Sequence, residues 1–155
     1  MKRLKKGFTL IELLVVIAII GILATTLAPK LREQLAKAKD AKAIALLGAA
    51  RTATQVILVD KLVISTGDSI TISQEDIEDK LDAKTADLLD DDSAEVAIGG
   101  SRDGVDGTMV YGGVATLVSS GEAITTDISA TDDEVELNLE GPNPNSTEGK
   151  EWDEY

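Results

Sequence analysis

A single carboxylate is the side chain near the amino terminus that is best placed to do chemistry. Glu12 is the only ionisable residue between Phe8 and Pro29. A charge at the bilayer centre costs about 2.5–3.5 kcal/mol, so an intramembrane carboxylate is a functional residue by default and needs a partner. Thr9 precedes it by three residues, and Thr-x-x-Glu also fits a helix capping box. The two roles are compatible, and both stay open here.

Two acidic loops in the second half of the chain carry oxygen atoms suited to Ca²⁺. The first contains Asp90 and Asp92, and the second contains Asp103 and Asp106. Neither loop follows the EF-hand pattern. Solvated turns of a very acidic domain also explain both loops. We therefore expect no cofactor, with Ca²⁺ at these carboxylates as the alternative.

Composition excludes several kinds of site. The chain has no cysteine and no histidine, so disulfides, thiolate metal sites, His-ligated zinc and a Ser-His-Asp triad are excluded. Carboxylates are plentiful, but none is paired in a recognisable catalytic motif. We therefore expect a protein that is not an enzyme.

The element that must position Glu12 is an apolar helix. From Phe8 to Ala28 it has 21 residues, which at about 1.5 Å per residue gives about 31 Å, close to the hydrocarbon thickness of a bilayer. The basic residues before Gly7 predict a cytoplasmic amino terminus. A plain single-pass anchor fits this length, whereas a cleaved secretory signal fits the basic start of the chain but has a shorter apolar region. Neither explains Glu12.

The string KGFTLIELL, residues 6–14, resembles the processing motif of type IV prepilins and of type II secretion pseudopilins. The resemblance implies that a prepilin peptidase and methyltransferase cleaves after Gly7 and N-methylates Phe8. Glu12 lies at the position of the family's assembly glutamate, and Pro29 matches its helix-interrupting proline. Phe8 would then carry a terminal amine, and Glu12 of a neighbouring subunit can pair with that cation, which lowers the cost of both charges.

This resemblance implies a structural subunit, a pilin, that polymerises through its hydrophobic helix into an extracellular type IV pilus-like filament. The expected partners are other copies in a helical homopolymer, the peptidase, an inner-membrane assembly platform, and membrane lipid before assembly. The subunit would be a single-pass protein of the cytoplasmic membrane and later part of a cell-surface filament. Gly21 allows close helix approach. The alternatives are a calcium-stabilised major pseudopilin of protein secretion and a membrane-anchored binding domain that never polymerises.

Charge divides the chain into zones. A basic leader, residues 1–7, has four positive charges, and residues 8–29 form the transmembrane or filament-core helix. Residues 30–59 continue the helix with a net charge of +4, whereas residues 60–155 form an acidic head with a net charge of −20. The acidic head would repel the phosphates of a nucleic acid, so we expect no nucleic acid to bind there. The lysines of residues 30–59 can face anionic lipid or the acidic heads of neighbouring subunits.

The predicted fold is α+β and pilin-like, a long amino-terminal helix packed on an antiparallel sheet of about four strands. The helix is expected over Phe8–Val59, with a kink or local loosening at Pro29. Its second half should pack on the head, and it carries a stripe at spacings of three and four: Leu31, Leu35, Ala38, Ala41, Ala45, Ala49, Ala53 and Val56. Ser73 is predicted to cap a short helix. Strands are expected at 70–72, 95–98, 108–118, 123–128 and 134–139, with a hairpin near 99–107 and a carboxy-terminal tail held by Trp152 and Tyr155.

Overall fold

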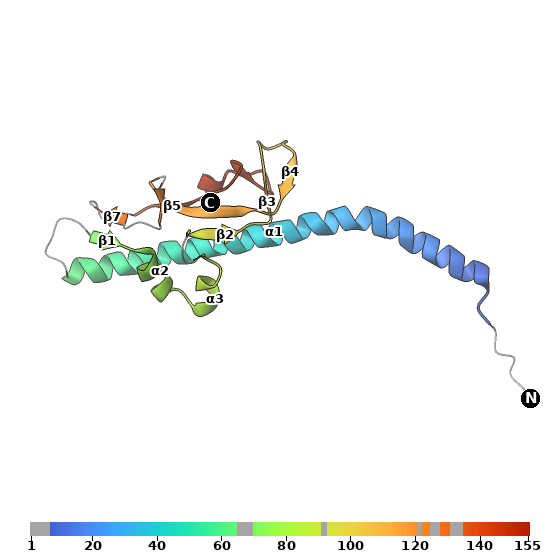
Figure 1. The fold of residues 1–155 in the computed structure, drawn as a ribbon, viewed down its shortest axis with the longest axis horizontal. Helices are drawn as coiled ribbons and strands as arrows, with labels where there is room; N and C mark the ends of the chain where they lie inside the picture. The colour runs from blue at the N-terminus through green and yellow to red at the C-terminus, as the bar shows by residue number, and fades with distance from the viewer. Residues whose placement is uncertain (1–6, 65–69, 91–92, 121, 125–127, 131–134) are drawn as a thin grey trace, which may run out of the picture. The chain divides into compact units, whose positions relative to one another are not determined.

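The apolar and alanine-rich first part of the chain forms one helix, α1, which runs from Leu10 to Ile64 (Figure 1). The computed structural model describes residues 7–64, 70–90, 93–120, 122–124, 128–130 and 135–155. The chain divides into two compact units, residues 1–34 and 35–155, and α1 contributes to both. The helix begins two residues later and ends five residues beyond the predicted range. Alanine, the best helix former, is dense in its second half.

Pro29 lies inside α1 without ending it. Its ring nitrogen carries no hydrogen, so the Thr25 carbonyl loses its usual donor four residues on. Thr25 and Thr26 donate their hydroxyl hydrogens to main-chain carbonyls of the preceding turn, at 2.8 Å to Ile22 and 2.9 Å to Leu23 respectively. The helix therefore continues through the proline.

Within the second unit, α1 packs on the head through a face that shares only the buried Ala53 and the half-buried Ala49 with the predicted stripe. Leu35 is 59% exposed and Val56 is 46% exposed, and Ala38, Ala41 and Ala45 are exposed as well. The second half of α1 does pack on the head, as expected, because another row of apolar residues along the helix is buried. Its members are Ala36, Ala43, Leu46, Leu47, Ala50, Ala53, Ile57 and Leu58.

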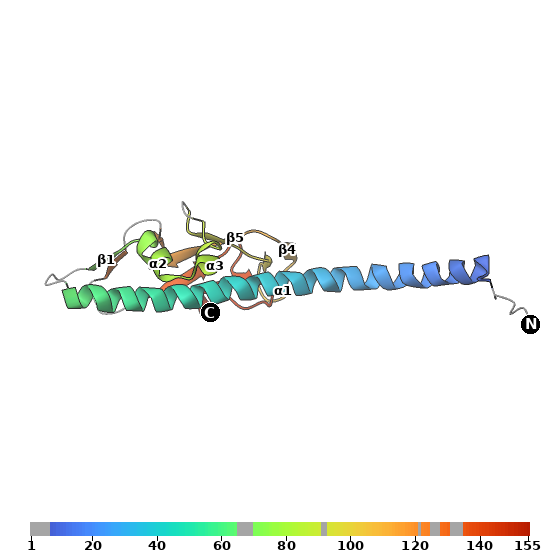
Figure 2. The same ribbon diagram turned by 90° about the horizontal axis from the view of Figure 1, so that it is seen from below.

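The head is built from short antiparallel strands that lie along the second half of α1, as Figures 1 and 2 show. The central strand β5 pairs with β2, β6 and β8; β3 lies between β4 and β9; and β1 pairs with β7. The strands are β1 Ile70–Ile72, β2 Glu95–Ala97, β3 Gly100–Arg102, β4 Met109–Tyr111, β5 Val114–Ser119, β6 Glu122–Ala123, β7 Ile128–Ala130, β8 Leu137–Glu140 and β9 Asn145–Ser146. The α+β class is confirmed. The described strands form one antiparallel sheet of four strands, as predicted, and two further sheets of three and two strands.

The predicted strand over 108–118 is wrong as one element. Gly112 and Gly113 have φ values of +80° and +120°, a region that favours glycine, and they separate β4 from β5. The predicted hairpin is confirmed, because β3 and β4 pair antiparallel with Ser101 opposite Val110. The predicted strand over 123–128 is also divided, into β6 and β7, and residues 125–127 lie outside the described part.

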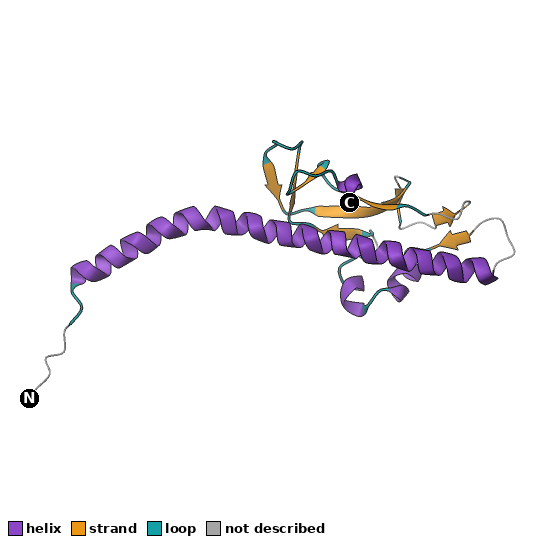
Figure 3. Cartoon of the chain, turned by 180° about the vertical axis from the view of Figure 1, so that it is seen from behind, coloured by secondary structure: helices purple, strands orange, loops and turns teal. Residues whose placement is uncertain are grey.

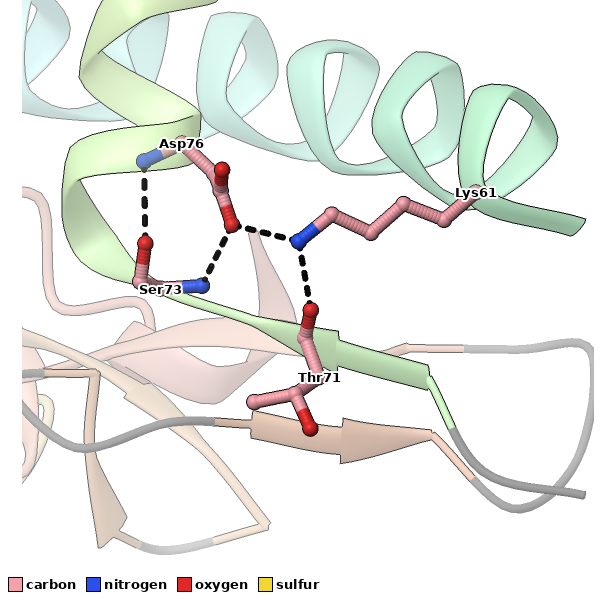
Figure 4. A network of polar contacts seen from close by, with 4 residues as sticks. All are labelled: Lys61, Thr71, Ser73 and Asp76. Atoms are coloured by element: carbon pink, nitrogen blue, oxygen red, sulfur yellow. Dashed lines mark hydrogen bonds and ion pairs between the residues drawn. The ribbon is translucent and has the colours of Figure 1, made fainter. Parts of the chain in front are cut away.

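Helix α2, Gln74–Lys80, begins where the sequence predicts. Ser73 accepts a hydrogen bond from the Asp76 main-chain N–H, and the Asp76 carboxylate accepts one from the Ser73 N–H, which completes a capping box. Figure 4 shows the same carboxylate bound to the Lys61 ammonium of α1 at 2.6 Å. Lys61 also donates to the Thr71 carbonyl. The Asp76 carboxylate therefore caps α2 and, through Lys61, also connects α2 to β1 and to the end of α1.

The carboxy-terminal segment returns to the core instead of forming only a loop. Trp152, in the short 3₁₀ helix η1 (Trp152–Glu154), is 2% exposed and packs in the core. Tyr155 hydrogen bonds through its hydroxyl to Ser146 of β9. The prediction that these two aromatic residues hold the tail is confirmed. Figure 3 shows this segment among the loops that join the head's strands. A further short helix, α3 Ala83–Ala86, follows α2 and is capped by Asp82.

Candidate functional site

The start of α1 is a capping box built by Thr9 and Glu12. The Glu12 carboxylate accepts a hydrogen bond from the Thr9 main-chain N–H at 2.8 Å and another from the Thr9 hydroxyl at 2.8 Å. The Thr9 hydroxyl oxygen in turn accepts from the Glu12 N–H at 3.3 Å. A box of this kind satisfies donors that would otherwise be left unpaired at the helix start. The capping role weighed from the sequence is therefore realised within one chain.

The Glu12 carboxylate lies on an apolar surface. Phe8 is 77% exposed, and the large apolar residues from Leu10 to Leu27 are between 44% and 80% exposed. Phe8, Ile11, Val15 and Val16 line a shallow hollow beside Glu12 with a volume of about 350 Å³. In water, such a surface is unfavourable by roughly 25 cal/mol per Å² of apolar area. This part of α1 therefore requires an apolar environment, either lipid or other protein chains.

The other residues predicted for processing and packing lie along the same segment. Gly7 and Phe8 precede the first turn of α1 and are exposed. Gly21 lies within the helix, and beyond its chain neighbours and the helix's own backbone no atom of the chain lies within 4 Å of the place where a Cβ would lie. Gly21 and Pro29 are both exposed, so neither is used to pack the described part of this chain. One helix in the described part, Leu10–Val63, is long and apolar enough to cross a membrane.

The acidic loops proposed as Ca²⁺ candidates do not converge. Among the described residues, no group of three His, Cys, Asp or Glu side chains is placed to hold a metal ion. Asp90 uses its carboxylate in its own turn, where it accepts hydrogen bonds from the Ser93 N–H and hydroxyl. Asp103 and Asp106 are exposed. Asp92 lies outside the described residues.

Asp40, which the sequence did not single out, is a buried carboxylate that joins α1 to two distant loops. It is 2% exposed. One carboxylate oxygen accepts from the Gly99 N–H at 2.7 Å, and the other accepts from the Thr147 N–H at 3.0 Å and the Thr147 hydroxyl at 2.5 Å. Hydrogen bonds to a charged acceptor are roughly twice as strong as neutral ones. Asp40 therefore holds the head on α1.

Arg51 makes a second polar connection from α1, eleven residues further on. Its guanidinium group donates to the main-chain oxygens of Leu137 and Tyr155 and to the Asn138 side-chain oxygen, at 2.8, 2.8 and 2.9 Å respectively. These bonds fix β8 and the end of the chain against the helix. The rigid fork of an arginine suits such multiple contacts.

Comparison with known proteins finds relatives for the amino-terminal segment and for most of the chain. The prokaryotic N-terminal methylation motif matches residues 2–28. The chain is 45% identical to the type IV major fimbrial protein FimA of Dichelobacter nodosus over 60 residues, which are 39% of this chain and 38% of that protein. It is 34% identical to a fimbrial protein of Pseudomonas aeruginosa over 125 residues, which are 79% of this chain and 75% of that protein. No solved structure matches the chain at a significant level.

Fold and site together define an α+β protein whose exposed, membrane-length helix carries one capped carboxylate and whose head is held on the helix by Asp40 and Arg51. The chain belongs to the type IV pilin family, as its similarity to the Pseudomonas aeruginosa fimbrial protein over most of both chains shows. The match to FimA spans about two fifths of that relative and covers the amino-terminal motif.

Proposed function

We propose that this chain is a structural subunit of a type IV pilus filament, with no catalytic activity of its own. The observation that carries the proposal is the single carboxylate Glu12 at the start of an exposed apolar helix, directly after the Gly7–Phe8 junction. A prepilin peptidase and methyltransferase would cleave that junction and methylate the new amino group of Phe8. An assembly platform of the inner membrane would then add the subunit to the filament.

The membrane serves as a reservoir for the subunit in this proposal. Before assembly, lipid covers the apolar part of α1, with the amino terminus in the cytoplasm as the basic residues before Gly7 indicate. In the filament, α1 helices of other subunits cover the same surface. Moving a helix from lipid to protein changes little apolar hydration, so close packing and polar contacts must decide the association. Gly21 supports close packing, because no side chain projects there.

Glu12 would supply the polar contact that sets the register between subunits. After cleavage, Phe8 carries a cation four residues before Glu12. The Glu12 carboxylate also accepts hydrogen bonds from Thr9, and a carboxylate has room for about four acceptor interactions. It can therefore keep its cap and still receive the amine of a neighbouring subunit. A subunit would be stable in the filament core only at the offset that pairs these charges.

Replacing Glu12 by glutamine tests this role separately from capping. Glutamine also completes a capping box, so Glu12→Gln should leave the start of α1 intact while it removes the negative charge. We expect the variant to accumulate in the membrane but to form few or no filaments, counted by electron microscopy of intact cells. Glu12→Ala, which removes cap and charge together, should be no less severe. Normal filaments from Glu12→Gln would contradict the charge-pairing role.

Processing is tested by mass spectrometry of the protein from native cells. The proposal requires an amino terminus at N-methylated Phe8. A terminus at Met1 or Lys2, or one created by cleavage near Pro29, would instead support a permanently anchored or secreted protein. Identification of this chain as the subunit of isolated surface filaments would complete the test.

A further inference from the structure

The carboxy-terminal end of the head contains an acidic hollow with a volume of about 570 Å³. Glu140, Glu151 and Asp153 line it, and all three are exposed. Its apolar lining includes Leu139, Pro142 and Trp152. No lysine or arginine is among the lining residues of this hollow in the described part of the chain. Negative charge around an apolar base suits an occupant with an apolar stem and a cationic tip.

The same hollow contains a polar atom without a partner. Trp152 is 2% exposed, and its ring N–H has no hydrogen-bond acceptor among the described residues. Gly141 lies against the indole so closely that a Cβ would be 2.5 Å from the ring nitrogen. Because an ammonium group has no acceptor atom, the indole N–H does not select the occupant, and the unpaired carboxylates alone indicate that a cation of another molecule completes this surface.

Matching cations lie on α1. Lys39 and Lys42 are exposed, and their spacing of three places them on neighbouring positions of the helix surface. Neither has a hydrogen-bond or ion-pair partner among the described residues. The exposed alanines Ala38, Ala41 and Ala45 lie beside them. The alanine stripe that does not pack on the head therefore carries both of these lysines.

We propose that the acidic hollow of one subunit receives Lys39 and Lys42 of a second copy of this chain. This inference rests on the proposed function and names the contact between heads and helices in that filament. The alkyl stems of the lysines would lie on the exposed Pro142, and their ammonium groups would pair with the carboxylates around it. Charge complementarity selects the partner, because residues 60–155 have a net charge of −20 and residues 30–59 one of +4.

The arrangement of the two surfaces fits a filament. The lysines and the hollow are separate patches, so each copy presents one of each kind. A contact between unlike patches is heterologous, and it repeats indefinitely when the rotation does not close into a ring. Self-complementary patches would instead give a closed dimer. Lys39 and Lys42 thus have a use besides attraction to anionic lipid headgroups.

A charge exchange tests the contact in intact cells. Lys39→Glu with Lys42→Glu should reduce the number of filaments about tenfold, and Glu140→Lys with Glu151→Lys should do the same, because several exposed pairs are lost. The four changes combined should restore filaments. Glu122→Lys with Glu148→Lys reverses the same number of exposed acids outside the hollow and should change filament number little. All variants are compared at equal membrane abundance.

Cysteine pairs provide a direct readout, because the natural chain has no cysteine. Cells that produce Lys42→Cys and Glu151→Cys subunits together should give a disulfide-linked dimer of the two variants in isolated filaments. Neither variant alone should give that dimer. The inference is overturned if the charge exchange does not restore filaments and no mixed dimer forms. It is also overturned if Lys39→Glu with Lys42→Glu loses binding to anionic vesicles while its filaments stay normal. In those cases, filaments made by wild-type cells still support the proposed function. The proposed function itself fails only if wild-type cells form no filaments.

Discussion

A single buried carboxylate determines how the head is attached to α1. Asp40 receives all three of its hydrogen bonds from residues at least 59 positions away in the sequence. Burial of a charge is costly unless several donors satisfy it. The donors come from Gly99 and from Thr147, so the bonds form only when both loops have reached the helix. This chain has no cysteine, and Asp40 supplies a long-range connection that a disulfide supplies in other small heads.

Asp40→Asn should destabilise the head by about 2–3 kcal/mol, because an amide N–H₂ replaces one acceptor oxygen and leaves a buried donor unpaired. Asp60→Asn is a matched control on the same helix. Asp60 pairs with Lys80 at 3.1 Å, but its side chain is 56% exposed, so the control should cost less than about 1 kcal/mol. Urea unfolding of the full chain in detergent, followed by fluorescence of the only tryptophan, Trp152, measures both. Equal effects of the two changes would contradict the role of Asp40.

Residues with local signals could be predicted from the sequence, and residues with distant partners could not. Glu12 stands out because its neighbours are uncharged, and its cap partner Thr9 is three residues away. Ser73 was predicted to cap α2 for the same local reason. Asp40 has no such signal, since Gly99 and Thr147 are brought to it by the fold. Its place between the buried residues Ala36 and Ala43 becomes informative only when the correct helix face is known.

At the scale of elements, the contact between α1 and the β2–β3 loop depends on one glycine. A Cβ on Gly99 would lie 1.9 Å from the Ala36 carbonyl oxygen and 2.3 Å from its carbon atom. Both are backbone atoms of a helix and cannot move as a side chain does. The loop therefore approaches α1 more closely than any other residue would allow. The same approach brings the Gly99 N–H to Asp40.

Gly99→Ala should destabilise the head by about 1–3 kcal/mol, the usual cost of forcing an extra methyl group into a packed interface. Gly48→Ala is the matched control, because Gly48 lies in α1 with open space around its Cα. Alanine is favoured over glycine in a helix, so the control should stabilise the protein by up to about 1 kcal/mol. The same tryptophan-detected unfolding measures both variants. Opposite signs are expected, and a stabilising Gly99→Ala would show that the contact yields easily.

Helices and strands were predicted well where hydrophobic periodicity agrees with the turn and cap residues at their ends, and less well where the two signals conflict. Strand β1 was predicted with its observed bounds, and helix α2 was predicted with its observed start. In α1, alanines occupy several faces, so a search for spacings of three and four finds two stripes. The larger side chains Leu46, Leu47 and Ile57 identify the buried stripe. Gly112–Gly113, at positive φ, divides what hydrophobicity alone presents as one strand.

At the scale of the whole molecule, the feature to explain is the uneven distribution of charge along the chain. Removal of residues 1–7 would take away four positive charges and leave a formal side-chain charge of −17. Most of that charge lies on the head, in the second compact unit. Repulsion among like charges opposes a compact state. Two ion pairs between α1 and the start of the head, Lys61–Asp76 and Asp60–Lys80, oppose this repulsion locally.

The stability of the head should therefore depend on pH in two opposite ways. Protonation of carboxylates on approach to pH of about 4 relieves repulsion and should stabilise the head. Further acidification should destabilise it. The hydrogen bond from Lys61, followed by that from the Ser73 N–H, holds the pKa of Asp76 below its ordinary value of 3.8. The hydrogen bond from the Thr85 hydroxyl is the largest cause that lowers the pKa of Asp82.

A carboxyl whose pKa is lower in the folded state stabilises that state above its unfolded pKa, and the contribution disappears as the pH falls through the folded pKa. Asp76→Asn should therefore be less stable than wild type at pH 7 and should become equal to it at a pH of about 2. The difference at pH 7 should stay below about 1 kcal/mol, because the Asp76 side chain is 37% exposed. Lys61→Gln should reproduce most of this convergence, since Lys61 is the largest cause of the shift. Unfolding followed by Trp152 fluorescence across this pH range measures it, and a difference that stays constant into acid would show that the negative charge of Asp76 does not stabilise the head.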